Sequence, residues 1–178
     1  MPSPPSSDPP VDSPRDLIQL RAALQAGQRR FPGLQLGDLD GVDLDLADCE
    51  LEGGCFKEAR FGHASLRAAR VEGCCFQQAL LWGADLSDLH AVHSFWQETD
   101  LSAARLQGAD LSFALMQGVQ LHGADLRGAC LYGANLSGAD LQQADLSGCD
   151  LRDTNLSGAK LEGANLENAA LSGGSRIS

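Results

Sequence analysis

The dominant pattern along the chain is a large apolar residue at every fifth position. Stepping by five from Leu46 to Leu171 gives 26 such positions, here called centre positions, of which 19 are Leu and three are Phe. The position two residues before each centre, here called the small position, is Ala in 16 of the 26 repeats. A helix repeats its faces about every 3.6 residues and a strand every two. Neither element can therefore keep both positions on one side.

A chain that turns a corner once per repeat can keep both positions on one side. Each short extended piece then points its centre and small residues inward, and the other three residues face solvent or form the turn. The position before the centre is often Asp or Asn, and the second position after it is often Gly. These residue types suit turns, because Asp and Asn oxygens accept backbone N–H groups and Gly adopts unusual dihedral angles. The pattern indicates a structural core and not an active site.

The repeats GADLR, GANLS, GADLQ and GANLE match the consensus A(D/N)LXX, so the chain resembles the pentapeptide-repeat proteins over residues 44–173. The resemblance implies an all-β fold, a right-handed quadrilateral parallel β-helix (a solenoid) with four pentapeptides per coil. Residues 20 apart would then stack on one side. The bulky centres Phe56, Phe76, Trp96 and Met116 fall in one such column, as this geometry requires. The segment AGQRRFPG, which leads into the repeats, is similar to cyanobacterial members.

Two frames compete in residues 31–51. One frame fits Leu39 and Leu44, whereas the other continues upstream from Leu46 and leaves Gly41 at a centre position. We therefore expect a two-residue slip, an irregular first coil, and regular repeats from about residue 44.

Composition divides the chain into four parts. A Pro-rich tail at residues 1–14 is expected to be disordered, because it cannot bury a core. A capping helix is expected in residues 15–30, the repeats in 31–173, and a short C-terminal tail in 174–178.

The segment SPRDLIQLRAALQAG carries the signals of the capping helix. Ser13 is the expected N-cap, Pro14 the first helical residue, and Gly27 the stop. Leu17, Leu20 and Leu24 recur at helical spacing, as LIQLRAAL shows, and form one apolar face. A short helix laid over the open end of the solenoid would bury this face.

Charge and composition argue against two classes of partner, nucleic acids and membranes. The 178 residues are 43% apolar and carry a formal net charge of −11, which disfavours direct binding to nucleic acid, because that affinity comes mainly from Lys and Arg. No stretch approaches the roughly 18 apolar residues of a membrane span, and the N-terminus lacks the features of a signal peptide. We expect a cytoplasmic protein with a protein partner and without a membrane or a cofactor.

No catalytic or metal site emerges from the sequence. His90 and His93 form an HxxH pair with Glu98 and Asp110 nearby, but a zinc site needs at least a third ligand held alongside. The serines lie in surface and turn positions, and the glycines recur with the repeat instead of forming a phosphate loop. We expect no enzyme activity.

The six cysteines form no CxxC pair, so neither a zinc site nor a disulfide framework is indicated. Cys55 and Cys75 lie one coil apart in the position before a centre. Stacked side chains point in parallel, however, whereas a disulfide needs converging Cβ atoms. We expect free thiols.

The segment DLHAVHSFWQETDL, residues 88–101, departs most from the consensus. Its frame is intact, because Ala91 and Trp96 are centres. Its outward positions, however, carry large apolar and aromatic residues, and the next coils continue them. The segment contributes Val92, His93 and Phe95, and the following coils stack Phe113, Leu115 and Tyr132 in the same columns. These six residues form the predicted partner-binding patch. Contiguous exposed apolar patches usually mark contact sites. The alternative is that these side chains pack into a widened corner.

Two functions follow as hypotheses. The first is a non-enzymatic protein–protein interaction module, or scaffold, that presents the patch on a rigid rod. The second rests on a resemblance to family members that mimic duplex DNA and regulate DNA gyrase through acidic ladders. The ladder residues here are Asp85, Asp110, Asp125, Asp145 and Asp150. Against it, Asp is simply the consensus residue at that position. A homodimer formed through an open solenoid end is a further expectation.

Overall fold

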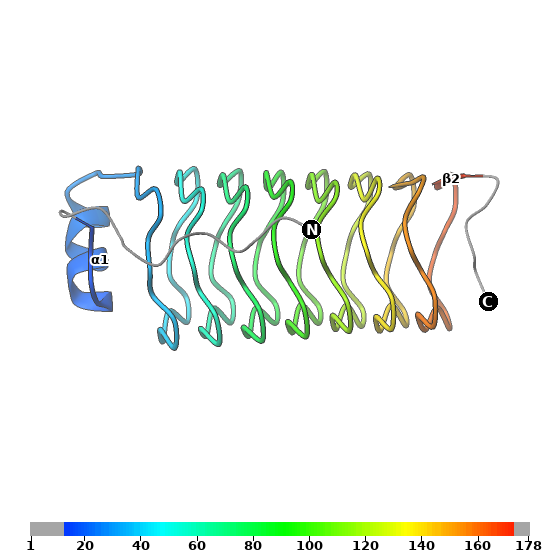
Figure 1. Ribbon diagram of the computed structural model, residues 1–178, viewed down its shortest axis with the longest axis horizontal. Coiled ribbons are helices and arrows are strands. Elements are labelled where there is room, and N and C mark those ends of the chain that lie inside the picture. The colour runs from blue at the N-terminus through cyan, green and yellow to red at the C-terminus, as the bar shows by residue number, and fades with distance from the viewer. Residues whose placement is uncertain (1–12, 173–178) are drawn as a thin grey trace.

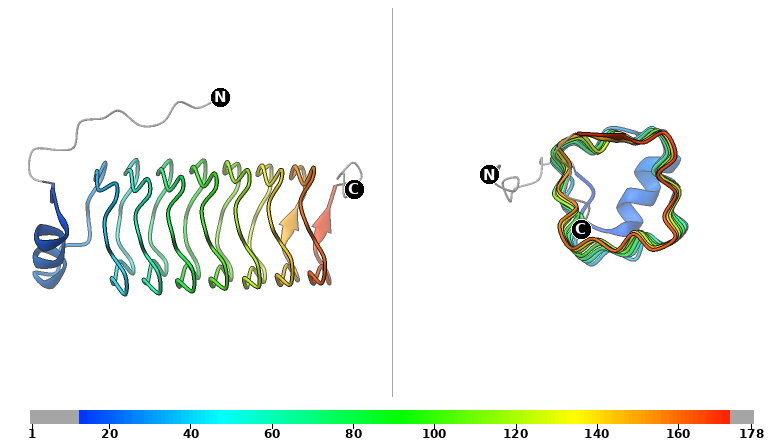
Figure 2. Two further views of the ribbon diagram at one scale, coloured as in Figure 1. Left: turned by 90° about the horizontal axis from the view of Figure 1, so that it is seen from below. Right: turned by 90° about the vertical axis from the view of Figure 1, so that its right-hand side faces the viewer.

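The computed structural model, which describes residues 13–172, is a rod of stacked coils with one helix lying across its N-terminal end (Figure 1). Viewed along the rod, each coil has four sides (Figure 2). Parallel bridges join residues that are 20 apart, from Arg30 paired with Glu50 to Asp145 paired with Asn165. Four pentapeptides therefore close one coil.

Backbone hydrogen bonds tie each coil to the next. The Phe76 N–H donates to the Phe95 carbonyl at 2.8 Å, and the Phe95 N–H donates to the Cys74 carbonyl at 2.9 Å. Each corner is closed by a bond within the coil, such as the Ala79 N–H to the Phe76 carbonyl at 3.0 Å. The sides are so short that most pair through a single residue. In the described part of the chain, only β1 (Asp150–Leu151) and β2 (Ala170–Leu171) pair over two residues, in parallel.

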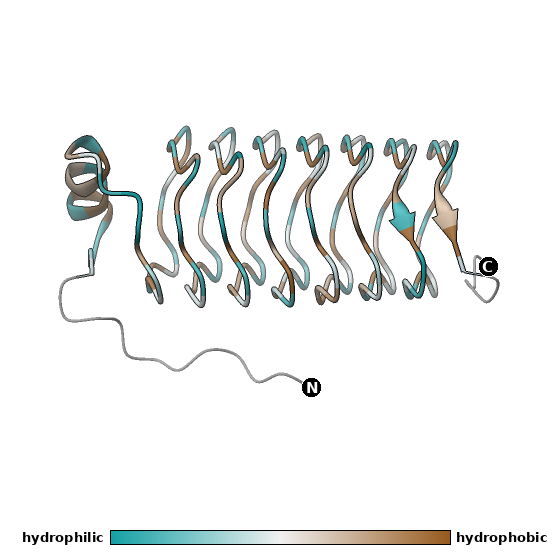
Figure 3. Cartoon of the chain, turned by 90° about the horizontal axis from the view of Figure 1, so that it is seen from above, coloured by the Kyte–Doolittle hydropathy of each residue, from teal (hydrophilic) through white to brown (hydrophobic). Residues whose placement is uncertain are grey.

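The core is a continuous column of centre and small residues that runs the length of the rod. Hydrophobic and hydrophilic segments alternate along every coil (Figure 3). The Phe56 and Phe76 rings stack at 5.1 Å between centroids, and the Phe76 and Trp96 rings stack at 4.3 Å. The aromatic column expected from the 20-residue spacing is confirmed.

Polar residues at small positions are buried with their hydrogen bonds satisfied. Thr99 Oγ1 donates to the Phe76 carbonyl at 2.6 Å, and Thr154 Oγ1 donates to the Leu131 carbonyl at 2.7 Å. Ser94 Oγ accepts the Trp96 indole N–H at 2.5 Å and donates to the Ala91 carbonyl. Because a buried polar group without a partner costs about 1–3 kcal/mol, these bonds explain how Ser and Thr replace Ala here.

The corners use left-handed backbone. The second residue after each centre, from Gly33 to Asn168, has a positive φ. Gly adopts this conformation readily, whereas bulky residues do so at a cost. His93, with φ of 57°, and Phe113, with φ of 59°, nevertheless occupy such corners.

The predicted slip in residues 31–51 is wrong. The bridges run in one register from Arg30 onward, so Gly41 is a true centre and is buried. A Cβ atom added to Gly41 would lie 2.7 Å from a Phe61 ring carbon of the next coil. The Phe61 ring thus fills the space that Gly41 leaves, and Leu39 and Leu44 occupy small positions. At this repeat the large residue, Leu39, occupies the small position and Gly41 occupies the centre, and the five-residue frame continues unchanged.

The capping helix is shorter than expected. Helix α1 spans Leu17–Gln25, and its N-cap is Asp16, whose Oδ1 accepts the Gln19 N–H at 2.8 Å. Ser13 and Pro14 precede it, so the expected N-cap at Ser13 is wrong. An Asp carboxylate is an equally good N-cap. The predicted stop at Gly27 is confirmed, with φ of 85°.

Helix α1 covers the first coil with its apolar face. Leu20 is fully buried in the core, and Leu17, Ala23 and Leu24 pack against it. Among residues 13–172 no helix covers the other end, where Leu161, Leu166 and Leu171 are all partly exposed. The two ends of the solenoid therefore differ.

Most of the predicted tails lie outside the described residues, at 1–12 and 173–178. Within residues 13–172, no helix has the length and apolar character needed to cross a membrane.

Candidate protein-interaction surface

Aromatic side chains form a line along one edge of the rod. The His93 and Phe113 rings stack at 5.2 Å between centroids with an angle of 22°, and the Phe113 and Tyr132 rings meet edge to face at 5.4 Å. These residues come from three successive coils. We call His93, Phe113 and Tyr132, with the half-buried Val92 and Leu115 beside them, the aromatic stripe.

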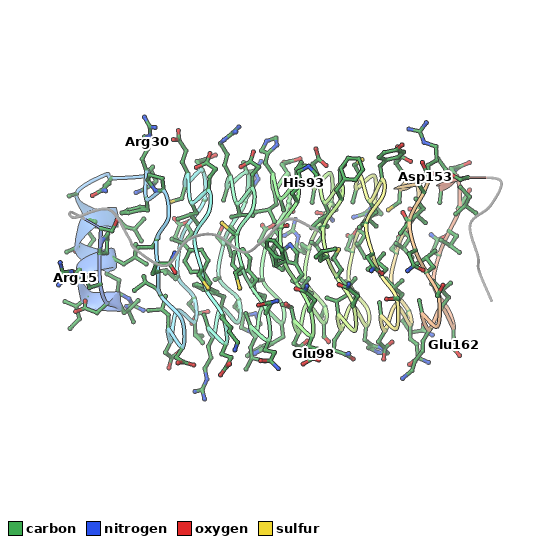
Figure 4. All side chains as sticks on the ribbon, viewed as in Figure 1. Arg15, Arg30, His93, Glu98, Asp153 and Glu162 are labelled. Atoms are coloured by element: carbon green, nitrogen blue, oxygen red, sulfur yellow. The ribbon has the colours of Figure 1, made fainter. Side chains whose placement is uncertain are left out.

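The aromatic stripe points away from the core. His93 is exposed, and Phe113 keeps 45% of its surface in solvent. His93 lies on the same edge of the rod as Asp153, three coils further toward the C-terminal end, with both side chains directed outward (Figure 4). The patch predicted from sequence is brought together here, except for one residue.

Phe95 does not belong to the exposed surface, so its predicted outward exposure is wrong. Only 6% of it is accessible. Its bridge partners are Cys75 in the preceding coil and Leu115 in the following one. The ring is buried on a flat side of the rod, in a column between Cys75 and Leu115. The alternative expected from sequence, packing into a widened corner, does not describe this burial, because Phe95 is not a corner residue.

The chain holds Phe113 over a glycine. A Cβ atom built on Gly133, which follows Phe113 in the same column, would lie 2.8 Å from the ring. Any other residue at 133 would push the ring aside. Phe113 itself sits in a left-handed corner, where a bulky side chain costs about 1–3 kcal/mol. The ring is therefore placed by local geometry at an energetic cost.

The C-terminal end of the aromatic stripe carries charge. The Arg152 guanidinium lies 5.7 Å from the Tyr132 ring centroid and forms an ion pair with Asp150 at 2.6 Å. The Arg152 hydrogen bond lowers the pKa of Asp150 to about 2. The Asp153 carboxylate raises the pKa of Tyr132. The aromatic stripe is thus flanked at its C-terminal end by both positively and negatively charged side chains.

The acidic ladder residues lie in their predicted columns, but they serve the turns and are interleaved with cations. Each carboxylate accepts the backbone N–H two residues on, as Asp145 does from Ser147 at 3.0 Å. Arg127 binds Asp125 through two bonds of 2.8 Å, which lowers the pKa of Asp125. Arg105 lies 4.0 Å from Asp85. The carboxylates of the remaining ladder residues likewise accept backbone N–H groups: Asp110 from Ser112, and Asp150 from Arg152.

The HxxH pair does not assemble a metal site. His90 is the bridge partner of Asp110, whereas His93 stacks on Phe113. Among residues 13–172 there is no group of three His, Cys, Asp or Glu side chains arranged to hold a metal ion.

A second aromatic cluster involves a contact that the sequence did not suggest. Leu80 and Trp82 are exposed apolar residues at outward positions, but nothing in the repeat pattern links His63 to them. The His63 and Trp82 rings meet edge to face at 4.3 Å. Trp82 is 44% exposed and lies over Gly62. Aromatic residues stacked against glycines 20 positions away are the sequence signal for both clusters.

All six cysteines are free thiols in the structure. Burial raises the pKa of Cys49 to about 11 and that of Cys149 to about 12. These thiols, like Cys74, lie at small positions inside the rod. They act as small core residues, and Cys149 donates to the Leu126 carbonyl at 2.9 Å.

Comparisons with known proteins agree with this architecture. The profile of pentapeptide repeats matches in eight copies, over residues 45–83, 83–112, 97–133 and 134–173. A search among curated protein sequences finds no match.

Solved structures of similar fold include a cyanobacterial protein. HetL from Nostoc sp. strain PCC 7120, a pentapeptide repeat protein involved in heterocyst differentiation regulation, is 23% identical, with a TM-score of 0.50 over 87% of this chain and 94% of HetL. A trypsin-treated variant of QnrB1, a plasmid-mediated fluoroquinolone resistance protein, is 18% identical, with a TM-score of 0.54 over 81% of this chain and 83% of that one. These matches support the predicted right-handed β-helix.

Proposed function

The chain belongs to the pentapeptide repeat family, and from that premise we propose that it is a non-enzymatic module that binds a protein partner through the aromatic stripe. Proteins of this family are generally structural or interaction modules. The observation that carries the proposal is the line of contacting rings, in which Phe113 meets both His93 and Tyr132, with His93 and Phe113 exposed and Tyr132 half-buried.

Physical chemistry supports the aromatic stripe as an interface. Aromatic residues are enriched at the centres of protein interfaces and dominate their energetics. The rod beneath is rigid, so the rings are held in place before a partner arrives, which lowers the entropy cost of binding.

The surface offers little for catalysis. The larger hollows on the described part of the chain lie open to water, and one of them is lined by Asp38, Asp40, Glu58, Arg60, Gln78 and Leu80. Active sites are usually enclosed clefts in which titratable groups converge.

Capture of a partner by the tagged full-length protein tests the proposal. We expect Phe113→Ser and Tyr132→Ser to reduce capture at least about tenfold, because truncating a central aromatic residue of an interface costs about 2 kcal/mol or more. Quantitative mass spectrometry of proteins retained from the native host measures the loss.

Trp82→Ser is the matched control, since Trp82 is as exposed as Phe113 but lies in the other aromatic cluster. It should leave capture of the same proteins unchanged. Equal capture by the wild type and both stripe variants would contradict the proposal, provided that circular dichroism shows all variants to be folded.

Regulation of DNA gyrase through acidic ladders has weaker support in the geometry. Arg105 and Arg127 interrupt one column of carboxylates, and Arg152 pairs with the other. A DNA mimic needs a surface that is negative throughout, because the enzyme's basic surface is adapted to phosphates.

We therefore expect the protein to leave DNA supercoiling by gyrase unchanged, in the presence and absence of a quinolone. An agarose-gel supercoiling assay over a range of protein concentrations measures this. Inhibition or protection that disappears in an Asp125→Asn, Asp145→Asn double variant would restore the ladder hypothesis.

A further inference from the structure

Cys55 and Cys75 lie side by side on successive coils, and both occupy the position before a centre. They are bridge partners in the parallel backbone, which is held here by the Cys75 N–H to Gly54 carbonyl bond at 2.9 Å and the Phe56 N–H to Cys75 carbonyl bond at 2.7 Å. A hydrogen bond also links the two thiols. The fold therefore brings together two sulfur atoms from different coils.

The spacing of the coils allows these two cysteines to form a disulfide. Neighbouring strands lie about 4.8 Å apart, and disulfides span Cα separations of about 4.4–6.8 Å. Because stacked side chains leave the backbone in parallel, the two Cβ atoms must still approach by about 1 Å to reach the usual separation of about 3.8 Å. The backbone bonds around Cys75 resist this approach. Strain makes a disulfide easier to reduce, so the geometry favours a reversible bond over a permanent one.

The two thiols differ in their surroundings. Cys55 is half-buried, whereas Cys75 is 4% exposed and lies between Cys55 and the buried Phe95 in one column. The hydrogen bond with the Cys75 thiol lowers the pKa of Cys55 to about 6 despite its burial, and Lys57 acts in the same direction. The same bond, together with burial, raises the pKa of Cys75. Cys55 is therefore the accessible thiolate at neutral pH, and Cys75 is a protonated thiol behind it.

We propose that Cys55 and Cys75 form a reversible modification site, at which hydrogen peroxide oxidises Cys55 and Cys75 then closes a disulfide with it. The thiolate is the nucleophilic form of cysteine. The Cys55 thiolate attacks one peroxide oxygen, the O–O bond breaks, and hydroxide leaves, which produces a sulfenic acid. The Cys75 sulfur then attacks the Cys55 sulfur, the S–O bond breaks, and the departing hydroxide takes up the Cys75 proton. Overall, two thiols and one peroxide give one disulfide and two waters.

The other four cysteines lack this combination of features. Three of them lie at small positions inside the core, where burial raises the pKa of each thiol: Cys49, Cys74 and Cys149. Cys130 occupies the same position of its repeat as Cys55, but its bridge partners are Asp110 and Asp150. Its neighbours in that column are therefore carboxylates instead of a thiol. The proposed pairing is specific to one place on the rod.

Treatment of the reduced full-length protein with an equimolar amount of hydrogen peroxide at neutral pH tests the proposal. We expect the chain to stay monomeric and to lose the mass of two hydrogen atoms, and dithiothreitol should restore that mass. Tandem mass spectrometry of proteolytic peptides should place the bond between Cys55 and Cys75. In urea the same treatment should give mixed pairings among the cysteines, because the fold no longer selects the pair.

Serine variants separate the roles of the two thiols. Cys75→Ser should lose the disulfide completely and accumulate the sulfenic acid at Cys55, which dimedone traps as a stable adduct. Cys55→Ser should show neither product, because the remaining thiol is buried and protonated. Cys130→Ser is the matched control and should form the disulfide like the wild type. Far-UV circular dichroism checks that each variant is folded.

Three results, obtained with folded protein, would overturn the proposal. The first is a Cys55 thiol that peroxide leaves unchanged. The second is conversion of Cys55 to a sulfinic acid without a bond to Cys75, which would show that the two sulfur atoms cannot meet. The third is oxidation that joins only separate chains, seen as a dimer in size-exclusion chromatography. None of these results depends on whether the aromatic stripe binds a partner.

Discussion

Replacing Phe76 with Ala should lower the free energy of unfolding by about 3–5 kcal/mol, the range found for removing a buried aromatic side chain. Phe76 is fully buried and stacks between Phe56 and Trp96. Three coils therefore lose contacts at once, and the backbone bonds around the cavity prevent it from collapsing. Urea denaturation followed by circular dichroism measures the loss.

Phe113→Ala is the comparison for this experiment, because it removes the same ring from a half-exposed corner. Its cost should be below about 1 kcal/mol, since surface substitutions rarely exceed that value. If the two variants were equally destabilised, the distinction between core and stripe would be wrong.

Replacing Gly41 with Leu, the commonest residue at a centre position, should destabilise the protein by about 1–3 kcal/mol, as overpacked cores do. The Phe61 ring already fills this space, so a Leu side chain has no room. If a slip instead placed Gly41 on the surface, the same change would have little effect. The midpoint of urea unfolding distinguishes the two registers.

A second substitution sharpens this test. Phe61→Leu alone should also destabilise, because it leaves a void beside Gly41. In the double variant Gly41→Leu, Phe61→Leu, both centres carry the consensus residue, and most of the stability should return. Such compensation is expected only for residues in direct contact. Additive losses would contradict the continuous frame.

Much of the fold could be predicted because the repeat itself encodes it. A residue at every fifth position has few ways to stay buried. The resemblance to pentapeptide-repeat proteins implied four repeats per coil, and the bulky centres 20 apart agreed with it. The first coil could not be predicted so well, because Leu39 and Gly41 exchange large and small sizes. At Ala91 the frame could be followed from the sequence although Leu89 and Ala91 also exchange large and small sizes, because regular repeats flank them on both sides.

The aromatic stripe was largely predictable, because the column of a residue follows from its number. The burial of Phe95 was not predictable, because it depends on how far Cys75 and Leu115 cover the ring. The position of a residue within the repeat does not tell how much of its side chain the neighbours cover. The contact between His63 and Trp82 was missed for a related reason. Their positions differ by one within the repeat, so they belong to neighbouring columns that only the corner geometry brings together.

The 20-residue register also determines how this rod can change in length. Inserting one whole coil of 20 residues between Ala91 and Trp96 would lengthen the molecule, and each side of every coil would still face in the same direction. Inserting a single pentapeptide there would keep the core equally well packed, yet everything downstream would turn by a quarter, and Phe113 would leave the edge occupied by His93. Length can therefore vary during evolution or engineering in steps of five without loss of folding, but only steps of 20 preserve a surface that spans several coils.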